Sequence, residues 1–178
     1  MAKLKFIYHK ALCDRQHYIN EDDVRVVLQR LPPEIWESLR TVHFNDRSWG
    51  ARIAGYADGT TDIAICALPP GISLTKFLVR GQSPKQFGAQ RGRKWPVLAI
   101  RRFLLYDVLL HEIGHLRIVN ESATRIRRKF ASEKLAQEFA DYWRWQLWSQ
   151  SFYHPDPVHN PPPGLKITAH SSALVVVA

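Results

Sequence analysis

The sequence predicts one α+β domain in which a short antiparallel sheet precedes two long helices. Its 178 residues suit a single domain with a sizeable core. Three short strand-like segments, bounded by turn residues, occur between residues 41 and 68. Two longer segments with helical character follow between residues 96 and 148. With 46% hydrophobic and 23% charged residues, the chain has an ordinary globular composition, so we expect these elements to pack together.

The first part of the chain is predicted to contain two helices and a strand. Asn20 is a typical helix cap, and it is followed by three acidic residues and by apolar residues at helical spacing up to Leu31. A proline pair ends this helix, and a second short helix is expected over residues 34–39. Residues 41–44, Thr-Val-His-Phe, are typical of a strand.

Two further strands are predicted over residues 51–56 and 62–68. The Asp58-Gly59 pair between them indicates a tight turn. Short connections of this kind favour an antiparallel meander. A proline pair follows the last strand, which favours a position for that strand at the edge of the sheet.

The rest of the domain is predicted to be a loop and two helices. Residues 71–95 contain four glycines, so we expect a long loop with one short strand over residues 74–79. A long helix is expected over residues 96–119, because a proline at its start suits the first turn. A last helix, rich in aromatic residues, is expected to begin at residue 122 or 131 and to end near residue 148.

The first long helix carries His111-Glu112-Ile113-Gly114-His115, which fits the pattern HExxH. Residues four apart share one helix face, so both imidazoles can bind one Zn²⁺. Glu112 can then act as general base toward a water whose pKa the metal lowers. The flanking residues are strongly apolar, and burying these polar side chains there without partners would be costly. The pattern therefore predicts a metal site.

A catalytic zinc site usually has three protein ligands and one open position. The extended pattern HExxHxxGxxH is absent here, so the third ligand must come from another element. Glu133 begins the sequence E-x-x-A-x-x-F-A on the last helix, and Ala136 and Ala140 share its face. Small residues at these positions would let the two helices approach closely. Glu133 is the predicted third ligand, and Glu138 is the alternative.

HExxH followed by this glutamate helix resembles the gluzincin branch of the zincin metallopeptidases, and is most similar to the small ImmA/IrrE-type and minigluzincin forms. The resemblance covers about residues 40–150. It implies a zincin-like fold with one Zn²⁺ per chain, held by His111, His115 and Glu133. It also implies that the protein is a metallopeptidase that hydrolyses peptide bonds, with Glu112 as the catalytic base.

The same resemblance implies how a peptide or protein substrate would bind. The strand over residues 62–68 would be the edge strand that pairs with an extended peptide. Its substrate-binding residues would be Ile63, Ala64, Ile65 and Cys66.

Two departures from the family pattern concern residues around the metal. Gln137 stands where many relatives have an Asp or Asn that orients a histidine ligand, and Asp141 or Glu138 are the alternatives for this role. No residue that would stabilise the oxyanion can be identified. The candidates are Tyr106, Tyr142, Tyr153 and His154.

The net charge of +9 is concentrated in the middle of the chain, where residues 76–102 hold eight basic residues and no acidic one. Arg125, Arg127, Arg128 and Lys129 form a second basic group. Such a segment is typical of nucleic-acid contact, of a solvated surface, or of a site for an acidic peptide. The alternative function is therefore a DNA-associated or regulatory binding protein on a zincin scaffold, with little or no turnover.

The proline-rich stretch from Tyr153 cannot be helical, so the domain is predicted over residues 1–152, followed by a tail over residues 153–178. One hypothesis is that this tail lies across the active-site cleft and restrains access. Another is that His154 or His159 supplies a fourth ligand, which would make the zinc site structural.

The chain has no apolar segment typical of a secretory signal, and no run of about 20 apolar residues that would span a membrane. Cys13 and Cys66 stand apart, without the CxxC spacing of a zinc ribbon, which fits a reducing compartment. We therefore expect a cytoplasmic protein that does not enter the membrane.

Overall fold

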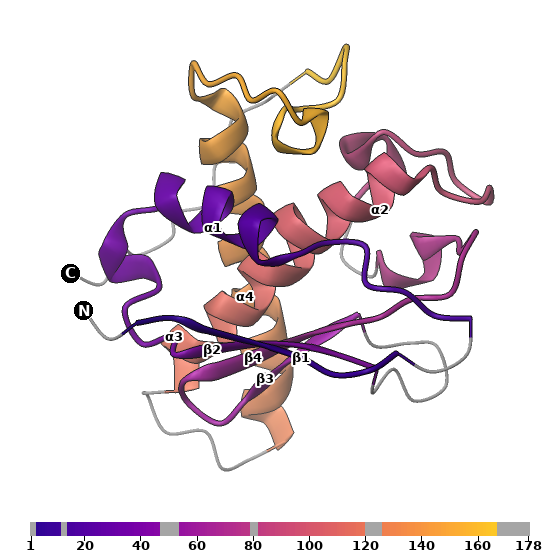
Figure 1. The fold of residues 1–178 in the computed structure, drawn as a ribbon. Helices are drawn as coiled ribbons and strands as arrows, with labels where there is room; N and C mark the ends of the chain where they lie inside the picture. Colours follow the sequence, from indigo (N-terminus) through magenta and orange to yellow (C-terminus); the bar gives the residue numbers. More distant parts are fainter. Residues whose placement is uncertain (1–2, 12–13, 47–53, 79–81, 120–125, 167–178) are drawn as a thin grey trace.

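The structure is a computed structural model that describes residues 3–11, 14–46, 54–78, 82–119 and 126–166. Within these ranges the chain forms an α+β fold, in which a four-stranded mixed sheet packs against helices (Figure 1). The predicted class is confirmed at this level. None of the described helices combines the length and the apolar character that crossing a membrane requires.

The sheet has the strand order β1 (Lys5–Tyr8), β2 (Thr41–Asn45), β4 (Asp62–Cys66) and β3 (Gly55–Asp58). β1 pairs with β2 and β2 with β4 in parallel, and only β3 and β4 are antiparallel. The predicted antiparallel meander is therefore wrong. The tight turn between β3 and β4 is present, but the longer connection after β2 carries the chain past β4 to the far edge of the sheet.

The predicted edge strand is an interior strand. Ile63, Ala64, Ile65 and Cys66 all lie in β4, which pairs with β2 on one side and with β3 on the other. All four side chains are buried, as expected for a strand covered on both faces. The proline pair, Pro69-Pro70, comes after the strand rather than within its ladder, so it does not place β4 at an edge. Among the described strands, β1 and β3 form the two edges.

The early helices agree in part with the sequence prediction. α1 (Glu21–Arg30) begins with a capping box in which Asn20 and Asp23 bond to each other's backbone. The second predicted helix is reduced to one 3₁₀ turn, Pro33–Ile35. The short strand predicted over residues 74–79 is wrong: Leu74–Phe77 is also a 3₁₀ turn, whose hydrogen bond closes locally instead of joining the sheet.

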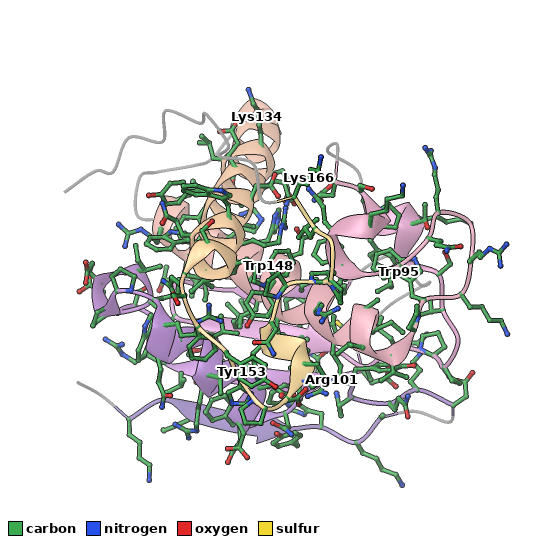
Figure 2. All side chains as sticks on the ribbon, turned by 90° about the horizontal axis from the view of Figure 1, so that it is seen from above. Trp95, Arg101, Lys134, Trp148, Tyr153 and Lys166 are labelled. Carbon is green, nitrogen blue, oxygen red and sulfur yellow. The ribbon has the colours of Figure 1, made fainter. Side chains whose placement is uncertain are left out.

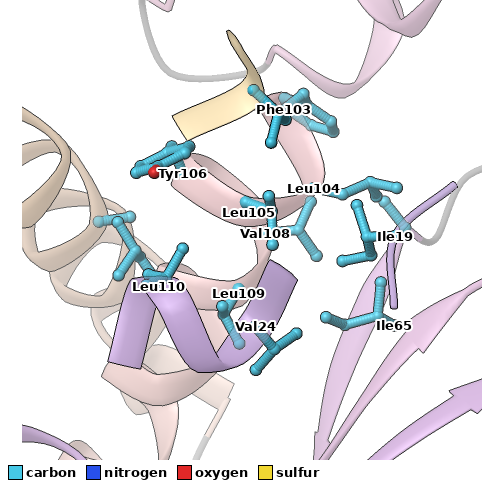
Figure 3. Packing of buried hydrophobic residues seen from close by; sticks show 14 of the residues in the cluster. Ile19, Val24, Ile65, Phe103, Leu104, Leu105, Tyr106, Val108, Leu109 and Leu110 are labelled. Carbon is cyan, nitrogen blue, oxygen red and sulfur yellow. The ribbon is translucent and has the colours of Figure 1, made fainter. Parts of the chain in front are cut away.

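The long helix predicted over residues 96–119 is present, but it is not uniform. α2 (Val97–Phe103) continues into a π-helical segment, η5 (Leu104–Val108), and then into α3 (Leu109–Val119). The apolar side chains of η5 and of the start of α3 pack against Ile65 of the sheet and Val24 of α1 (Figure 3). The last helix, α4 (Ile126–Ser149), runs alongside α3.

α3 and α4 approach each other closely at three small residues. A Cβ atom on Gly114 would lie only 3.1 Å from the Cα atom of Ala136 and from Phe139 Cδ1. Ala136 and Ala140 are fully buried at this contact. The predicted role is confirmed for Ala136, and the contact brings the start of α4 to the middle of α3.

The described part of the C-terminal segment, residues 153–166, packs at the other end of α4. It contains one 3₁₀ turn, Pro157–His159, whose Val158 and His159 are buried beside α1 and α2. Tyr153 and Lys134, which is near the start of α4, lie toward opposite sides of the molecule (Figure 2). The domain boundary at residue 152 stays a prediction.

Candidate metal centre

Two helices bring three metal-binding side chains to one point. His111 and His115 are one turn apart on α3, and their Nε2 atoms are 3.0 Å from each other. Glu133, on α4, places Oε2 3.3 Å from His111 Nε2 and Oε1 3.4 Å from His115 Nε2. Among the described residues, these three form the one cluster of His, Cys, Asp and Glu whose donor atoms could hold a metal ion.

The spacing of the three donors fits a tetrahedral ion. Zinc binds imidazole nitrogen and carboxylate oxygen at about 2.0–2.1 Å, which places two ligand atoms of a tetrahedron about 3.3 Å apart. The two imidazole nitrogens are 3.0 Å apart, and each lies 3.3–3.4 Å from a different oxygen of Glu133, so all three contacts are close to this value. Two neutral imidazoles and one carboxylate are also a donor set that zinc favours. The residues therefore fit the metal that the sequence predicts.

The helix contact explains why Glu133 reaches the two histidines. Because Gly114 has no side chain, α4 can approach α3 until Ala136 touches it, and Glu133 is one turn earlier on the same face of α4. Ser132, the residue before Glu133, places its hydroxyl 3.2 Å from His115 Nδ1. The side chain of Glu133 is 39% exposed, so the cluster opens to solvent on one side.

Glu112 lies beside the cluster but points toward the sheet. It is buried, and the backbone N–H of Ala57 in β3 hydrogen-bonds to its carboxylate. Gly55 makes room for this arrangement, since a Cβ atom there would clash with Val108 and approach Glu112 Cγ to 3.4 Å. Burial, together with the nearby Glu133, raises the pKa of Glu112 to about 7, although His111 opposes this. A carboxylate of this kind can exchange protons near neutral pH.

The charges around His111 favour a cation. Burial lowers the pKa of its imidazole. A hydrogen bond with Glu133 and the charges of Glu112 and Asp107 raise this pKa by more, so the net shift is upward. The same carboxylates that favour a proton on this ring favour a metal ion at its Nε2.

Behind the histidines lies a buried polar network that the sequence did not predict. Asp107 of η5 accepts hydrogen bonds from Arg144 and from Gln137, which are both on α4. Arg144 and Gln137 also bond to Asp141. Gln137 therefore contacts two carboxylates rather than an imidazole. An aspartate inside an apolar helix was the available signal, because such a group needs buried partners.

Several predicted site residues lie elsewhere. Glu138, the alternative third ligand, pairs with Lys134 instead. Tyr106 is buried against His159 and Arg30, and Tyr153 is 82% exposed. Three further residues were considered for the oxyanion or as a fourth ligand. They form their contacts away from the three donors, and they are His154, His159 and Tyr142.

The basic segment divides into two groups. Arg101 and Arg102 belong to the interior of the fold: Arg101 pairs with Asp23 and Asp156, and Arg102 is buried and donates to the Pro157 carbonyl. The exposed cations of the segment are Lys76, Lys85, Arg91, Arg93 and Lys94. Arg80 and Arg125 lie outside the described residues.

Comparisons with protein-family models, with curated proteins and with solved structures found no match to this chain. The functional interpretation therefore depends on the residues of the site and on their geometry.

Proposed function

We propose that this protein is a zinc-dependent metallopeptidase with a zincin-like fold. His111, His115 and Glu133 would hold one Zn²⁺, and Glu112 would be the general base. The observation that carries the proposal is the pair of imidazole nitrogens 3.0 Å apart, each 3.3–3.4 Å from one oxygen of Glu133, next to a buried carboxylate that does not belong to this cluster. A site with three protein ligands and one solvent-facing side is typical of catalytic rather than structural zinc.

Bound Zn²⁺ would acidify a water molecule and polarise the scissile carbonyl. Glu112 accepts the proton of the attacking water and later delivers it to the leaving amine. The Ala57 N–H holds the Glu112 carboxylate against the sheet, so that it stays beside the three ligands without joining them.

The substrate would be an extended peptide that adds to β3. β4 cannot take this role, because both of its sides are already paired. β3 is an edge strand among those described, and its residues Gly55 and Ala57 lie directly against Glu112. A peptide paired with the outer side of β3 would therefore run close to the proposed base.

The test compares three substitutions in metal content and peptide hydrolysis. Glu133→Ala should lose most of the zinc that elemental analysis finds in the wild type, and Glu138→Ala, a matched change on the same helix, should keep it. Glu112→Gln should retain zinc and lose at least about 100-fold in the rate of peptide cleavage. A wild type that binds no metal, or a Glu112→Gln variant as active as the wild type, would refute the proposal.

The exposed cations favour a second candidate function, binding to nucleic acid with little or no turnover. Lys85, Arg91, Arg93 and Lys94 are all exposed within ten residues of chain, and no acidic residue lies among them. This function would be supported if the wild type binds a DNA duplex with an affinity that falls steeply with salt concentration. The double variant Arg91→Ser, Arg93→Ser should then show a shallower salt dependence. Lys134→Ser, an exposed cation on α4, is the matched control. Equal salt dependence in all variants would show that this segment does not contact the duplex.

A further inference from the structure

The two histidine ligands differ in how their second ring nitrogen is supported. His115 Nδ1 lies 3.2 Å from the Ser132 hydroxyl. His111 Nδ1 is buried and has no hydrogen-bond partner among the described residues. A metal-binding imidazole usually donates its second N–H to a carboxylate, a carbonyl or water, which fixes its tautomer and orientation. His111 is therefore a buried ligand that lacks this support.

Asp107 is the nearest carboxylate on the same helix. It precedes His111 by four residues and hence lies on the same side of the helix, one turn earlier. Helical side chains lean toward the N-terminus, so the ring of His111 lies over the turn that carries Asp107. The charge of Asp107 acts directly on His111. Asp107 is only 4% exposed, so water competes little for its oxygens.

The carboxylate of Asp107 is held in place by α4. Arg144 Nη1 donates to Oδ1 at 2.6 Å, and Gln137 Nε2 donates to the same oxygen at 3.0 Å. Oδ2 takes part in no hydrogen bond with the described residues. One oxygen is thus anchored and the other is available, although an ionised carboxylate can accept about four hydrogen bonds.

We propose that Asp107 is the positioning residue of His111. The two side chains form no hydrogen bond in this structure. With a metal at Nε2 the ring proton is left on Nδ1, and Oδ2 of Asp107 would then accept a hydrogen bond from it and so keep Nε2 directed at His115 and Glu133. Gln137 then supports this carboxylate instead of supporting an imidazole. The inference rests on the proposed metal site, and it places the orienting carboxylate on the ligand's own helix.

The experiment measures the dissociation constant for zinc by competition with a chromogenic chelator, in the wild type, Asp107→Asn and Asp141→Asn. Asp107→Asn keeps the shape of the side chain and removes its charge, so zinc should bind about 10- to 100-fold more weakly. Asp141 belongs to the same network but is not in the turn before His111, so Asp141→Asn should bind zinc as tightly as the wild type. The fold of each variant is checked by circular dichroism.

The outcomes separate this inference from the proposed function. If the wild type binds no zinc, both are overturned. If the wild type binds zinc and folded Asp107→Asn binds it equally well, or if Asp141→Asn weakens binding as much, only the positioning role is overturned.

A second measurement decides the matter if Asp107→Asn does not fold. In the zinc-loaded wild type, the imidazole nitrogens of His111 are observed by ¹⁵N–¹H correlation. An Nδ1–H resonance at low field that exchanges slowly with water is the expected result. An Nδ1–H that exchanges as fast as that of an exposed histidine such as His9 would overturn the inference.

Discussion

Among the clusters of histidines and acidic side chains in the described part of the chain, the two at opposite ends of α4 are built differently. In the metal centre, His111 and His115 turn their Nε2 atoms toward each other and toward Glu133. At the other end of α4, His159 directs Nδ1 to the Tyr106 hydroxyl at 3.1 Å and Nε2 to Asp23 at 3.6 Å, while His154 accepts a backbone N–H.

The two clusters differ in the partners of their ring nitrogens. In the second cluster both ring nitrogens of His159 and Nδ1 of His154 each have their own protein partner, and His159 is 1% exposed. In the first, three donor atoms converge on one point at a partly exposed surface. Residue type alone does not distinguish a ligand from a structural histidine. Convergence of donors indicates a ligand, and dispersed partners indicate a structural role.

The largest expected effect is on zinc affinity, which should depend on the histidines of the first cluster and not on those of the second. His111→Ala removes one of three ligands, so zinc should bind at least about 1,000-fold more weakly, beyond the 10- to 100-fold typical of supporting residues. His159→Ala should bind zinc as the wild type does. Chelator competition on the two variants measures this. Equal losses in both would mean that the comparison is wrong.

The free energy of unfolding should respond in the reverse order, with the larger loss in the second cluster. His159→Ala empties the space of a buried ring and removes one partner each from Tyr106 and Asp23, and we expect the free energy of unfolding to fall by about 2–4 kcal/mol. His111→Ala, measured without metal, should cost less, because its imidazole is part of an open cluster. Urea unfolding of both metal-free proteins tests the order. A larger loss for His111→Ala would contradict it.

The third prediction concerns the helix contact that holds the first cluster together. Gly114→Val would place methyl groups against the backbone of Ala136 and the ring of Phe139, which should push α4 away at a cost of about 1–3 kcal/mol. Zinc affinity should fall together with stability. The control is Leu135→Val, at an exposed position on α4. Unchanged zinc binding in a folded Gly114→Val variant would show that Glu133 does not need this contact.

The smallest effect is the response of the second cluster to acid. Burial raises the pKa of Asp23, but hydrogen bonds with His159, Asn20 and Arg101 outweigh it, and the net pKa is lowered. A lowered pKa stabilises the fold above the unfolded value of 3.8, and this contribution is lost as the pH falls through the folded value. We therefore expect the free energy of unfolding to fall as the pH decreases below about 4.

The measurement is the urea midpoint between pH 3 and pH 6, for the wild type and Asp23→Asn. The substitution should flatten the pH dependence, whereas Asp22→Asn, an exposed neighbour on α1, should leave it unchanged. If Asp23→Asn keeps the pH dependence of the wild type, groups other than Asp23 cause it.

The sequence was most informative where a pattern is local. Capping at Asn20 and the HExxH spacing on the long helix depend on residues within a few positions of each other, and the structure confirms both elements. Glu133 could be chosen over Glu138 because Ala136 and Ala140 indicated the contact face.

The errors concern long-range partners. The interior position of β4 depends on pairing with β2 and β3, and its uninterrupted apolar run was a better signal than the prolines that follow it. The partners of Asp107 lie about 30 residues or more further along the chain, on another helix. No local pattern could name them, although a buried aspartate signals that partners exist.

The π-helical segment has a consequence for the kinds of change that the chain tolerates. An α-helix turns by about 100° per residue, so η5 acts as a phase adjustment between the face that α2 buries and the face on which α3 carries its histidines. Substitutions within η5 keep that phase. Because a π-helical turn holds about one residue more than an α-helical turn, a deletion of one residue between Leu104 and Tyr106 would let η5 return to α-helical turns. The histidines would then keep nearly the same direction relative to α2. A one-residue change in length is thus better tolerated within η5 than in a regular part of the helix, where it would turn the histidines by about 100°.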